Sequence, residues 1–574
     1  MDKLYTDERN VQMLLYLMKQ YSIKRVIASP GATNVNVVSS MQQDPFFEMY
    51  SCVDERSAAY MAVGMAEETG EPIVLSCTGA TSSRNYLPAL TEAYYRKLPV
   101  IAVTSSQNSN RIGHLIAQVT DRSDPPRDTV VKSFQVNPVK DGNDEWDCAI
   151  KLNLALQLHK ITPGPIHINL VTTSSRNHSV QELPICKKIK LFTDKDDLPK
   201  LPSNGRTGIF IGSHVRFTET ETKCIEAFCE TYDAVVFCDH TSNYYGKYKI
   251  QYALMGAQES WWSSCAQLPL LIYIGEVSGD YDTLCTLIPS NMWRVSPDGE
   301  FRDPTLGKLS AVFAMDELSF FQRYTQGKNK THCNYYKECA EEYHKLVDAF
   351  PVVPLSNIYV AKKLSGDIPT NSLVYLGILN TLRSWNYFEL PKGVRAQCNV
   401  GGFGIEGIVS SCIGASLANP SQLCFAFVGD LSFFYDMNSI GNREIKGNLR
   451  VLVVNNGHGQ EFENYNHAAS YLGDDVNKYV AAAGHFGCKS LDLVKHYAVD
   501  LGFEYLSAKT CEEFDGVYQK FLRANTDGKP ILFEVFTSEN DENTALKASR
   551  NVIVDKQLLA KRKIRNVISK IKNL

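Results

Sequence analysis

A chain of 574 residues is long enough for roughly three or four domains, each with its own core. The net charge of −4 argues against a general nucleic-acid binder, which is normally basic. No apolar run approaches the roughly 20 residues of a membrane helix, and the start of the chain has neither the basic nor the apolar stretch of a signal peptide. The sixteen cysteines include no C-x-x-C pair and no zinc-site spacing. We therefore expect a cytoplasmic protein with reduced thiols.

The first third of the chain alternates short apolar runs with helical stretches. The expected strands are residues 25–29, 73–77, 100–104 and 166–170. Glu55 stands at the start of a helix of small apolar residues, and the strand after that helix ends in the turn Thr78-Gly79. A lysine-rich stretch over 187–204, with two prolines, is typical of a linker.

The rest of the chain repeats this rhythm twice. The middle third has expected strands at 208–212, 234–238, 270–275, 293–296 and 311–314, and the last third has them at 373–379, 424–428, 449–454, 504–507 and 531–535. Strands that alternate with helices indicate parallel sheets covered on both faces. We predict an α/β protein of three doubly wound parallel-sheet domains, at residues 1–185, 200–325 and 350–574. A basic, amphipathic helix is expected over 556–572.

Polar residues end two neighbouring strands of the last third. Gly429-Asp430-Leu431-Ser432 follows one buried run, and Asn455-Asn456-Gly457 follows the next. Mg²⁺ prefers oxygen ligands from carboxylate, amide, backbone carbonyl and phosphate, which strand ends hold rigidly. An aspartate after a glycine at a strand end can also be a plain helix cap. If these strand ends instead hold Mg²⁺, the sequence predicts a site for a metal-bound diphosphate.

Taken with Glu55, these motifs resemble the thiamine diphosphate (ThDP) enzymes of the acetolactate synthase and pyruvate decarboxylase superfamily. The resemblance implies a pyrimidine-binding, a central and a diphosphate-binding domain. It implies ThDP and Mg²⁺ as cofactors, with Glu55 as the carboxyl that shares a proton with the cofactor's aminopyrimidine. It also implies a homodimer or homotetramer whose site is shared between subunits, and no nucleic-acid or membrane partner. The central third has no G-x-G-x-x-G motif, so a bound nucleotide there has no specific support.

Further positions carry over from the family one by one. Asp430, Asn456 and the backbone carbonyl of His458 match the metal ligands. Residues that match the cofactor-lining positions are Thr78, Gly79, Gly404, Ile405, Gly429, Leu431 and Ser432. Ile405 matches the bulky residue that bends the cofactor, although it could equally be a core isoleucine.

Leu431 stands where the commonest family motif has glycine. This motif and the segment Gly402 to Ser411 resemble more specifically the menaquinone-pathway 2-succinyl-5-enolpyruvyl-6-hydroxy-3-cyclohexene-1-carboxylate synthases. Those enzymes hold a dicarboxylic acceptor with arginines. Here the corresponding segments contain Ala32-Thr33, Gln107 and Val400. Because the guanidinium fork binds carboxylates in a way that these side chains cannot, the sequence predicts a less anionic second substrate, or none.

Proton transfer needs an acid within hydrogen-bond reach of the reacting atoms. The candidates, by family position, are His114, Gln118, His458, Glu461 and His467, although polar residues of such loops can simply face water. Arg122 lies in the same loop as His114. Arg383 could hold a 2-oxo acid carboxylate or pair with Glu389 on the surface.

Three functions remain open from the sequence. The leading one is a carboligase that decarboxylates a 2-oxo acid and passes the acyl anion to an aldehyde or ketone. The second is a simple decarboxylase that releases an aldehyde. The third, from another class, is a non-catalytic, cofactor-binding regulatory homologue.

Overall fold

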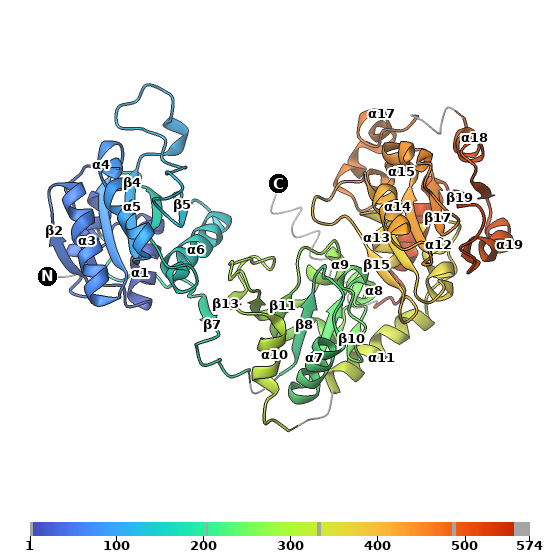
Figure 1. Cartoon of the computed structure of the whole chain (residues 1–574), viewed down its shortest axis with the longest axis horizontal. Coiled ribbons are helices and arrows are strands. Elements are labelled where there is room, and N and C mark those ends of the chain that lie inside the picture. Colours follow the sequence, from blue (N-terminus) through green and yellow to red (C-terminus); the bar gives the residue numbers. More distant parts are fainter. Residues whose placement is uncertain (1–3, 203–204, 330–333, 485–489, 556–574) are drawn as a thin grey trace. The chain divides into compact units, whose positions relative to one another are not determined.

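A computed structural model of the chain describes residues 4–202, 205–329, 334–484 and 490–555, so the helix expected over 556–572 lies outside it. The chain forms three sheets, and every strand pair with a determined register is parallel (Figure 1). The predicted fold class is confirmed. By its contacts the chain divides into two compact units, residues 1–199 with 292–316 and residues 200–291 with 317–574.

The first sheet has the order β2-β1-β3-β4-β6-β5. Its strands are β1 (Arg25–Ala28), β2 (Glu48–Ser51), β3 (Ile73–Thr78), β4 (Val100–Ser106), β5 (Lys132–Val136) and β6 (Ile166–Val171). Its main helices are α1 (Arg9–Gln20), α2 (Val35–Gln42), α3 (Glu55–Thr69), α4 (Thr81–Asn85), α5 (Leu87–Arg96) and α6 (Gly142–Gln157). The alanines of α3 pack with α5 on β3, because side chains this small allow the helix a close approach to the strand.

The middle sheet has the order β10-β9-β8-β11-β12-β13-β7. Its strands are β7 (Lys190–Thr193), β8 (Thr207–Ile211), β9 (Ala234–Cys238), β10 (Lys249–Ile250), β11 (Gln267–Ile274), β12 (Ile288–Val295) and β13 (Leu309–Ala314). The helices beside them are α7 (Glu219–Tyr232), α8 (Ala253–Gly256), α9 (Tyr281–Leu284), α10 (Glu317–Thr325) and α11 (Asn334–Asp348). A full capping box starts α7: the Thr218 hydroxyl accepts from the Glu221 backbone N–H, and Glu221 accepts in return.

The last sheet has the order β15-β14-β16-β17-β19-β18. Its strands are β14 (Leu373–Leu376), β15 (Arg395–Gln397), β16 (Cys424–Gly429), β17 (Leu449–Asn455), β18 (Glu504–Ala508) and β19 (Ile531–Phe536). The helices are α12 (Asn357–Leu364), α13 (Asn380–Trp385), α14 (Ile408–Ala418), α15 (Asp430–Asp436), α16 (Gln460–Glu463), α17 (Val476–Tyr479), α18 (Leu493–Asp500), α19 (Cys511–Leu522) and α20 (Glu539–Ser549).

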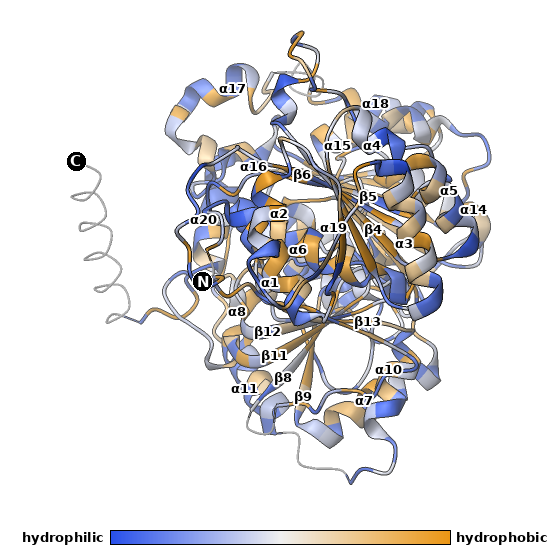
Figure 2. Cartoon of the chain, turned by 90° about the vertical axis from the view of Figure 1, so that its left-hand side faces the viewer, coloured by the Kyte–Doolittle hydropathy of each residue, from blue (hydrophilic) through white to orange (hydrophobic). Residues whose placement is uncertain are grey.

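The central strands of the sheets are apolar along nearly their whole length and are drawn as hydrophobic in Figure 2. Strands buried on both faces need such continuous runs, since helices cover each side. The strand order reverses beside β1 in the first sheet and beside β14 in the last. At such switch points the connections leave in opposite directions and open a crevice at the carboxyl ends of the strands. Among the described helices none is both long and apolar enough to cross a membrane.

Candidate functional site

Glu55 is the first residue of α3 and lies beside α4. Its Oε2 accepts a 3.2 Å hydrogen bond from the Nδ2 of Asn85. Partial burial would raise the pKa of Glu55, but hydrogen bonds from Ser82 and Asn85 outweigh it and lower the pKa below its ordinary value. The carboxyl group is therefore ionised at neutral pH and can accept a hydrogen bond from a protonated nitrogen placed against it.

The turn after β3 joins three strand ends at one edge of the first sheet. Thr78 contacts the hydroxyl of Thr33, which donates in turn to the carbonyl of Ser105 at 2.6 Å. Gly79 has no room for a side chain, because a Cβ there would lie 2.6 Å from the Nη1 of Arg122. The two residues that were expected to line a cofactor thus lie at the switch point of this sheet.

His114 and Gln118 lie in the segment between β4 and β5, and both side chains are exposed. Gln118 has a φ of 65°, in the left-handed region that residues other than glycine seldom adopt. The structure describes neither residue in contact with Glu55.

A pocket of about 220 Å³ opens at the carboxyl ends of β14, β16 and β17. Eight of the residues expected from the sequence line it: Ile405, Gly429, Asp430, Leu431, Ser432, Asn456, His458 and Glu461. Gly404 is the neighbour of one lining residue, and a Cβ on it would lie 2.7 Å from the Glu406 carboxylate. The lining residues that sequence reasoning missed include Asn357, Gly377, Ile378 and Leu379. Residues 377–379 follow β14, and the switch point there would have indicated them had the strand order been known.

Asp430 is the buried acid of this pocket. Its Oδ2 accepts a 2.9 Å hydrogen bond from the backbone N–H of Gly457, which ties the end of β16 to the turn after β17. Burial raises the pKa of Asp430 to about 6. A cation beside the carboxylate would reverse that shift, so the environment favours a positively charged ligand.

Asn456 and His458 bring further oxygen atoms to the same turn. The Oδ1 of Asn456 is 3.4 Å from the backbone N–H of His458, and the carbonyl of His458 accepts from Gln460 at 3.0 Å. With Asp430 they provide a carboxylate, an amide and a backbone carbonyl, the hard oxygen donors that suit Mg²⁺. The residues present therefore fit a magnesium ion.

A buried network lies under this turn. The Nδ2 of Asn455 donates to the Oε1 of Glu534 at 2.7 Å, and the hydroxyl of Tyr505 donates to its Oε2 at 2.7 Å. Glu534 has no exposed surface, and Asn455 is 5% exposed. The first asparagine of the pair thus supports the turn, and Glu534 on β19 is a partner that sequence reasoning did not find.

Ile405 lines the same pocket as this turn. The hydroxyl of Ser432 donates to the backbone carbonyl of Ile405, which joins the start of α15 to the loop before α14. Leu431, at the position where the family motif commonly has glycine, adds an apolar side chain to the lining.

Glu461 is held by an ion pair rather than facing solvent. Both Nη atoms of Arg383 donate to its carboxylate, at 2.9 and 3.0 Å, and Asn464 donates at 3.1 Å. Arg383 therefore pairs with Glu461, and the alternative pair with Glu389 is not formed among the residues that the structure describes. His458 has its Nε2 3.0 Å from the Oε1 of Gln460.

A second pocket, of about 200 Å³, adjoins the first through Leu379 and Glu461. His467 lines it, and its Nδ1 accepts a 3.0 Å hydrogen bond from the backbone N–H of Ala469. This bond leaves Nε2 to carry the proton of the neutral ring. His467 thus belongs to the second pocket, whereas His458 and Glu461 belong to the first.

Thr33, Gln107 and Val400 stand in the segments where the menaquinone-pathway synthases have arginines, and here they make structural contacts. Thr33 is bonded to β3 and β4, Val400 is 4% exposed, and Gln107 accepts a 2.7 Å hydrogen bond from Arg111. None of the three presents a cation at these positions.

The chain has relatives among known enzymes along nearly all of its length. Residues 9–124 match the family described as thiamine pyrophosphate enzyme, N-terminal TPP binding domain. The chain is a relative of the thiamine pyrophosphate enzymes. That match contains Glu55, Thr78 and Gly79, and it confirms the resemblance inferred from the motifs.

Three relatives carry the name 2-succinyl-5-enolpyruvyl-6-hydroxy-3-cyclohexene-1-carboxylate synthase. The protein of Bacteroides fragilis is 27% identical over 560 residues, which are 95% of this chain and 99% of the relative. That of Bacteroides thetaiotaomicron is 27% identical over 563 residues, 95% and 98% of the two chains. That of Desulfotalea psychrophila is 25% identical over 540 residues, 90% and 96%. The similarity therefore spans all three sheets.

Proposed function

We propose that this chain is a ThDP- and Mg²⁺-dependent enzyme that decarboxylates a 2-oxo acid and transfers the resulting acyl anion to an aldehyde or ketone acceptor. The observation that carries the proposal is the pocket at the ends of β14, β16 and β17, where Asp430, Asn456 and His458 meet. The names of the relatives, which are synthases, favour a carboligase over a simple decarboxylase.

Asp430, the Oδ1 of Asn456 and the carbonyl of His458 would hold Mg²⁺. Gly429, Leu431 and Ser432 would approach the diphosphate with backbone N–H groups at the start of α15, which lack partners inside the helix. The chemistry that ThDP supplies when bound is a carbon nucleophile and an electron sink for decarboxylation.

Glu55 would share a proton with the aminopyrimidine ring, and its lowered pKa means that an ionised carboxylate would accept a hydrogen bond from the protonated ring nitrogen. Ile405 would fill the space under the cofactor and hold it bent. Thr78 and Gly79 would line the pyrimidine half. In the resembling family the two halves come from neighbouring subunits, so the proposal includes a homodimer or homotetramer.

Glu461, His458 and His467 would move protons at the reacting carbon. Both carboxylate oxygens of Glu461 accept hydrogen bonds from Arg383, an arrangement that suits an anchor better than an acid. His458, on the cofactor pocket itself, is the better donor candidate. His114 and Gln118 would reach the substrate from the segment between β4 and β5.

The acceptor is proposed to be less anionic than that of the menaquinone-pathway synthases. Thr33, Gln107 and Val400 supply none of the guanidinium groups that a dicarboxylic acceptor needs. Turnover of isochorismate with 2-oxoglutarate at a rate typical of enzymes would refute this part of the proposal.

The test is carbon dioxide release from pyruvate, 2-oxobutyrate and 2-oxoglutarate with ThDP and Mg²⁺, with and without an acceptor aldehyde. The proposal predicts release that depends on the acceptor and falls at least about 100-fold in Glu55→Gln. Fast release without an acceptor would indicate the simple decarboxylase. Tight ThDP binding with no release under any condition would indicate the non-catalytic homologue.

A further inference from the structure

A separate pocket lies within the first unit, behind the strand ends that carry Gly79. Its cavity measures about 70 Å³ and lies between β4, β6, the start of α5 and the segment 121–130. This is smaller than the cavity of about 150 Å³ that holds a benzene ring, so it suits a ligand of only a few heavy atoms. None of its lining residues belongs to the pocket around Asp430.

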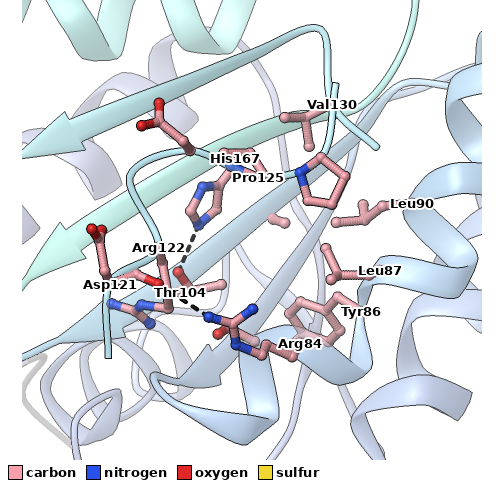
Figure 3. Close-up of a pocket in the computed structure, with 14 residues that line it drawn as sticks. Arg84, Tyr86, Leu87, Leu90, Thr104, Asp121, Arg122, Pro125, Val130 and His167 are labelled. Carbon is pink, nitrogen blue, oxygen red and sulfur yellow. Dashed lines mark hydrogen bonds between the residues drawn. The ribbon is translucent and has the colours of Figure 1, made fainter. Parts of the chain in front are cut away.

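The two ends of this pocket differ in character (Figure 3). Arg84, Thr104 and Arg122 lie at one end, and Leu87, Leu90 and Val130 lie at the other. Leu90 and Val130 are buried, so the apolar end is a wall of the domain core. Such an arrangement suits a ligand with a polar group at one end and an apolar body.

Arg122 carries a buried charge that the described residues do not neutralise. Its side chain is 9% exposed, and its Nη2 donates to the Oδ1 of Asn169 at 2.5 Å. Its Nε and Nη1 have no hydrogen-bond partner, and no carboxylate forms an ion pair with it in the part of the chain that the structure describes. A buried cation without a partner is costly, so an anionic ligand would remove a penalty that the protein otherwise carries.

The neighbouring charges leave this end of the pocket open to an anion. Arg84 lies close enough to Arg122 to lower the pKa of that guanidinium, in the same direction as burial does. The Asp121 carboxylate also lines the pocket; it is exposed and accepts from the backbone N–H and hydroxyl of Ser123. Its negative charge raises the pKa of Arg122, but by less than burial lowers it. Asp124, another lining residue, is also exposed.

The histidine of the pocket adds no competing charge. His167 is 6% exposed, and its two ring nitrogens lie 2.7 Å from the Thr104 hydroxyl and 2.8 Å from the Ser133 hydroxyl. Both ring nitrogens thus have neutral partners and the ring serves as a wall. Arg122 and Arg84 remain the cationic groups of this pocket.

We propose that this pocket binds a short-chain monocarboxylate, its carboxylate at Arg122 and its short apolar body towards Leu87, Leu90 and Val130. The site lies wholly in the first unit and does not depend on the proposed ThDP chemistry. It shares the α4–α5 segment with Glu55, because Asn85 of α4 donates to Glu55 and the adjacent Tyr86 lines the pocket.

The test uses trifluoroacetate as the probe and fluorine NMR to follow its binding to the full chain, with no ThDP present. The expected result is saturable binding that is at least about tenfold weaker in Arg122→Met and for the neutral probe trifluoroacetamide. Arg127→Ala, which removes an exposed arginine of the same segment, is the matched control and should bind as the wild type does. Arg122→Gln retains a donor for Asn169 without the charge and replaces Arg122→Met if that variant does not fold.

The same titration on Asp430→Asn separates this site from the proposed cofactor site, and it should show unchanged affinity. The proposal is overturned by an absence of saturable binding up to about 10 mM probe, or by equal affinity for the acid and the amide. Equal affinity in wild type and the folded Arg122 variant would overturn it too, as would loss of binding in Asp430→Asn. Each of these results leaves the proposed function untouched.

Discussion

The buried network of Asn455, Glu534 and Tyr505 supports the turn Asn455-Asn456-Gly457, so we predict that replacing Glu534 weakens cofactor binding. Replacing Glu534 by alanine removes the acceptor of two hydrogen bonds, from Asn455 and from Tyr505, each 2.7 Å long. Hydrogen bonds to a charged group contribute roughly 1.5–3 kcal/mol each. Burial raises the pKa of Glu534, so part of that gain offsets the cost of burying its charge. The net loss of stability is expected to be about 2–4 kcal/mol.

The size of the loss depends on which atoms replace the carboxylate. Glu534→Gln is expected to lose no more than about 1 kcal/mol, because its Oε1 can accept from Asn455 while its amide donates to the Tyr505 oxygen. Glu534→Ala should lower the thermal midpoint of the last domain by on the order of 10 °C. It should also weaken Mg²⁺-dependent ThDP binding, since Asn455 precedes the proposed ligand Asn456 in the turn.

The matched control is Leu532→Ala, a fully buried change two residues earlier on β19 that is expected to cost about 2–5 kcal/mol. Thermal unfolding gives the stability, and the quenching of tryptophan fluorescence by ThDP gives the affinity. The reasoning predicts that Glu534→Ala loses more affinity than Leu532→Ala at equal loss of stability. It is refuted if the two variants lose affinity equally, or if the alanine and glutamine variants at position 534 are equally stable.

Three further outcomes are expected. Glu55→Gln should bind ThDP but exchange the proton of the thiazolium carbon more slowly by at least about 100-fold, and equal exchange rates by NMR would contradict its role. Gly256→Ala places a Cβ 1.9 Å from the backbone oxygen of Asp282 and should cost about 2–4 kcal/mol in a denaturant titration, whereas Gly64→Ala, with nothing within 4 Å, should not destabilise. Burial lowers the pKa of His167 and His240 to about 3, below about 6.5 in the unfolded chain, so the unfolded state binds more protons as the pH falls through 6.5. Between pH 6.5 and 3 the free energy of unfolding should fall by up to about 1.4 kcal/mol per pH unit for each histidine. In His167→Gln only the contribution of His240 to this pH dependence should remain.

The strands and the cofactor motif could be predicted because their signals are local. Continuous apolar runs such as Leu449 to Val454 occur where a strand is buried on both faces, and Asp430 and Asn456 come directly after such runs. The predicted pocket residues therefore meet once parallel strands place their carboxyl ends at one edge. The site roles of these residues and the boundaries at 1–185, 200–325 and 350–574 stay predictions.

What the sequence did not indicate depends on pairing between distant segments. Glu534 meets Asn455 because β19 pairs with β17 across 79 positions of the chain, and no motif marks that register. The partner of Arg383 on α13 is Glu461 on α16 and not Glu389, because Arg383 and Glu461 line the same pocket. Arg122 lies in a loop of polar residues, and nothing in the sequence distinguishes a buried arginine there from exposed ones.

The central claim is that Asp430 anchors a magnesium-bound diphosphate at the end of β16. Isothermal titration calorimetry of ThDP into the wild type and Asp430→Asn, each with and without Mg²⁺, tests it directly. The account predicts saturable binding by the wild type only with Mg²⁺, and affinity at least about 100-fold weaker in the variant. Equal affinity in the two proteins, or binding of ThDP that is indifferent to Mg²⁺, would contradict it.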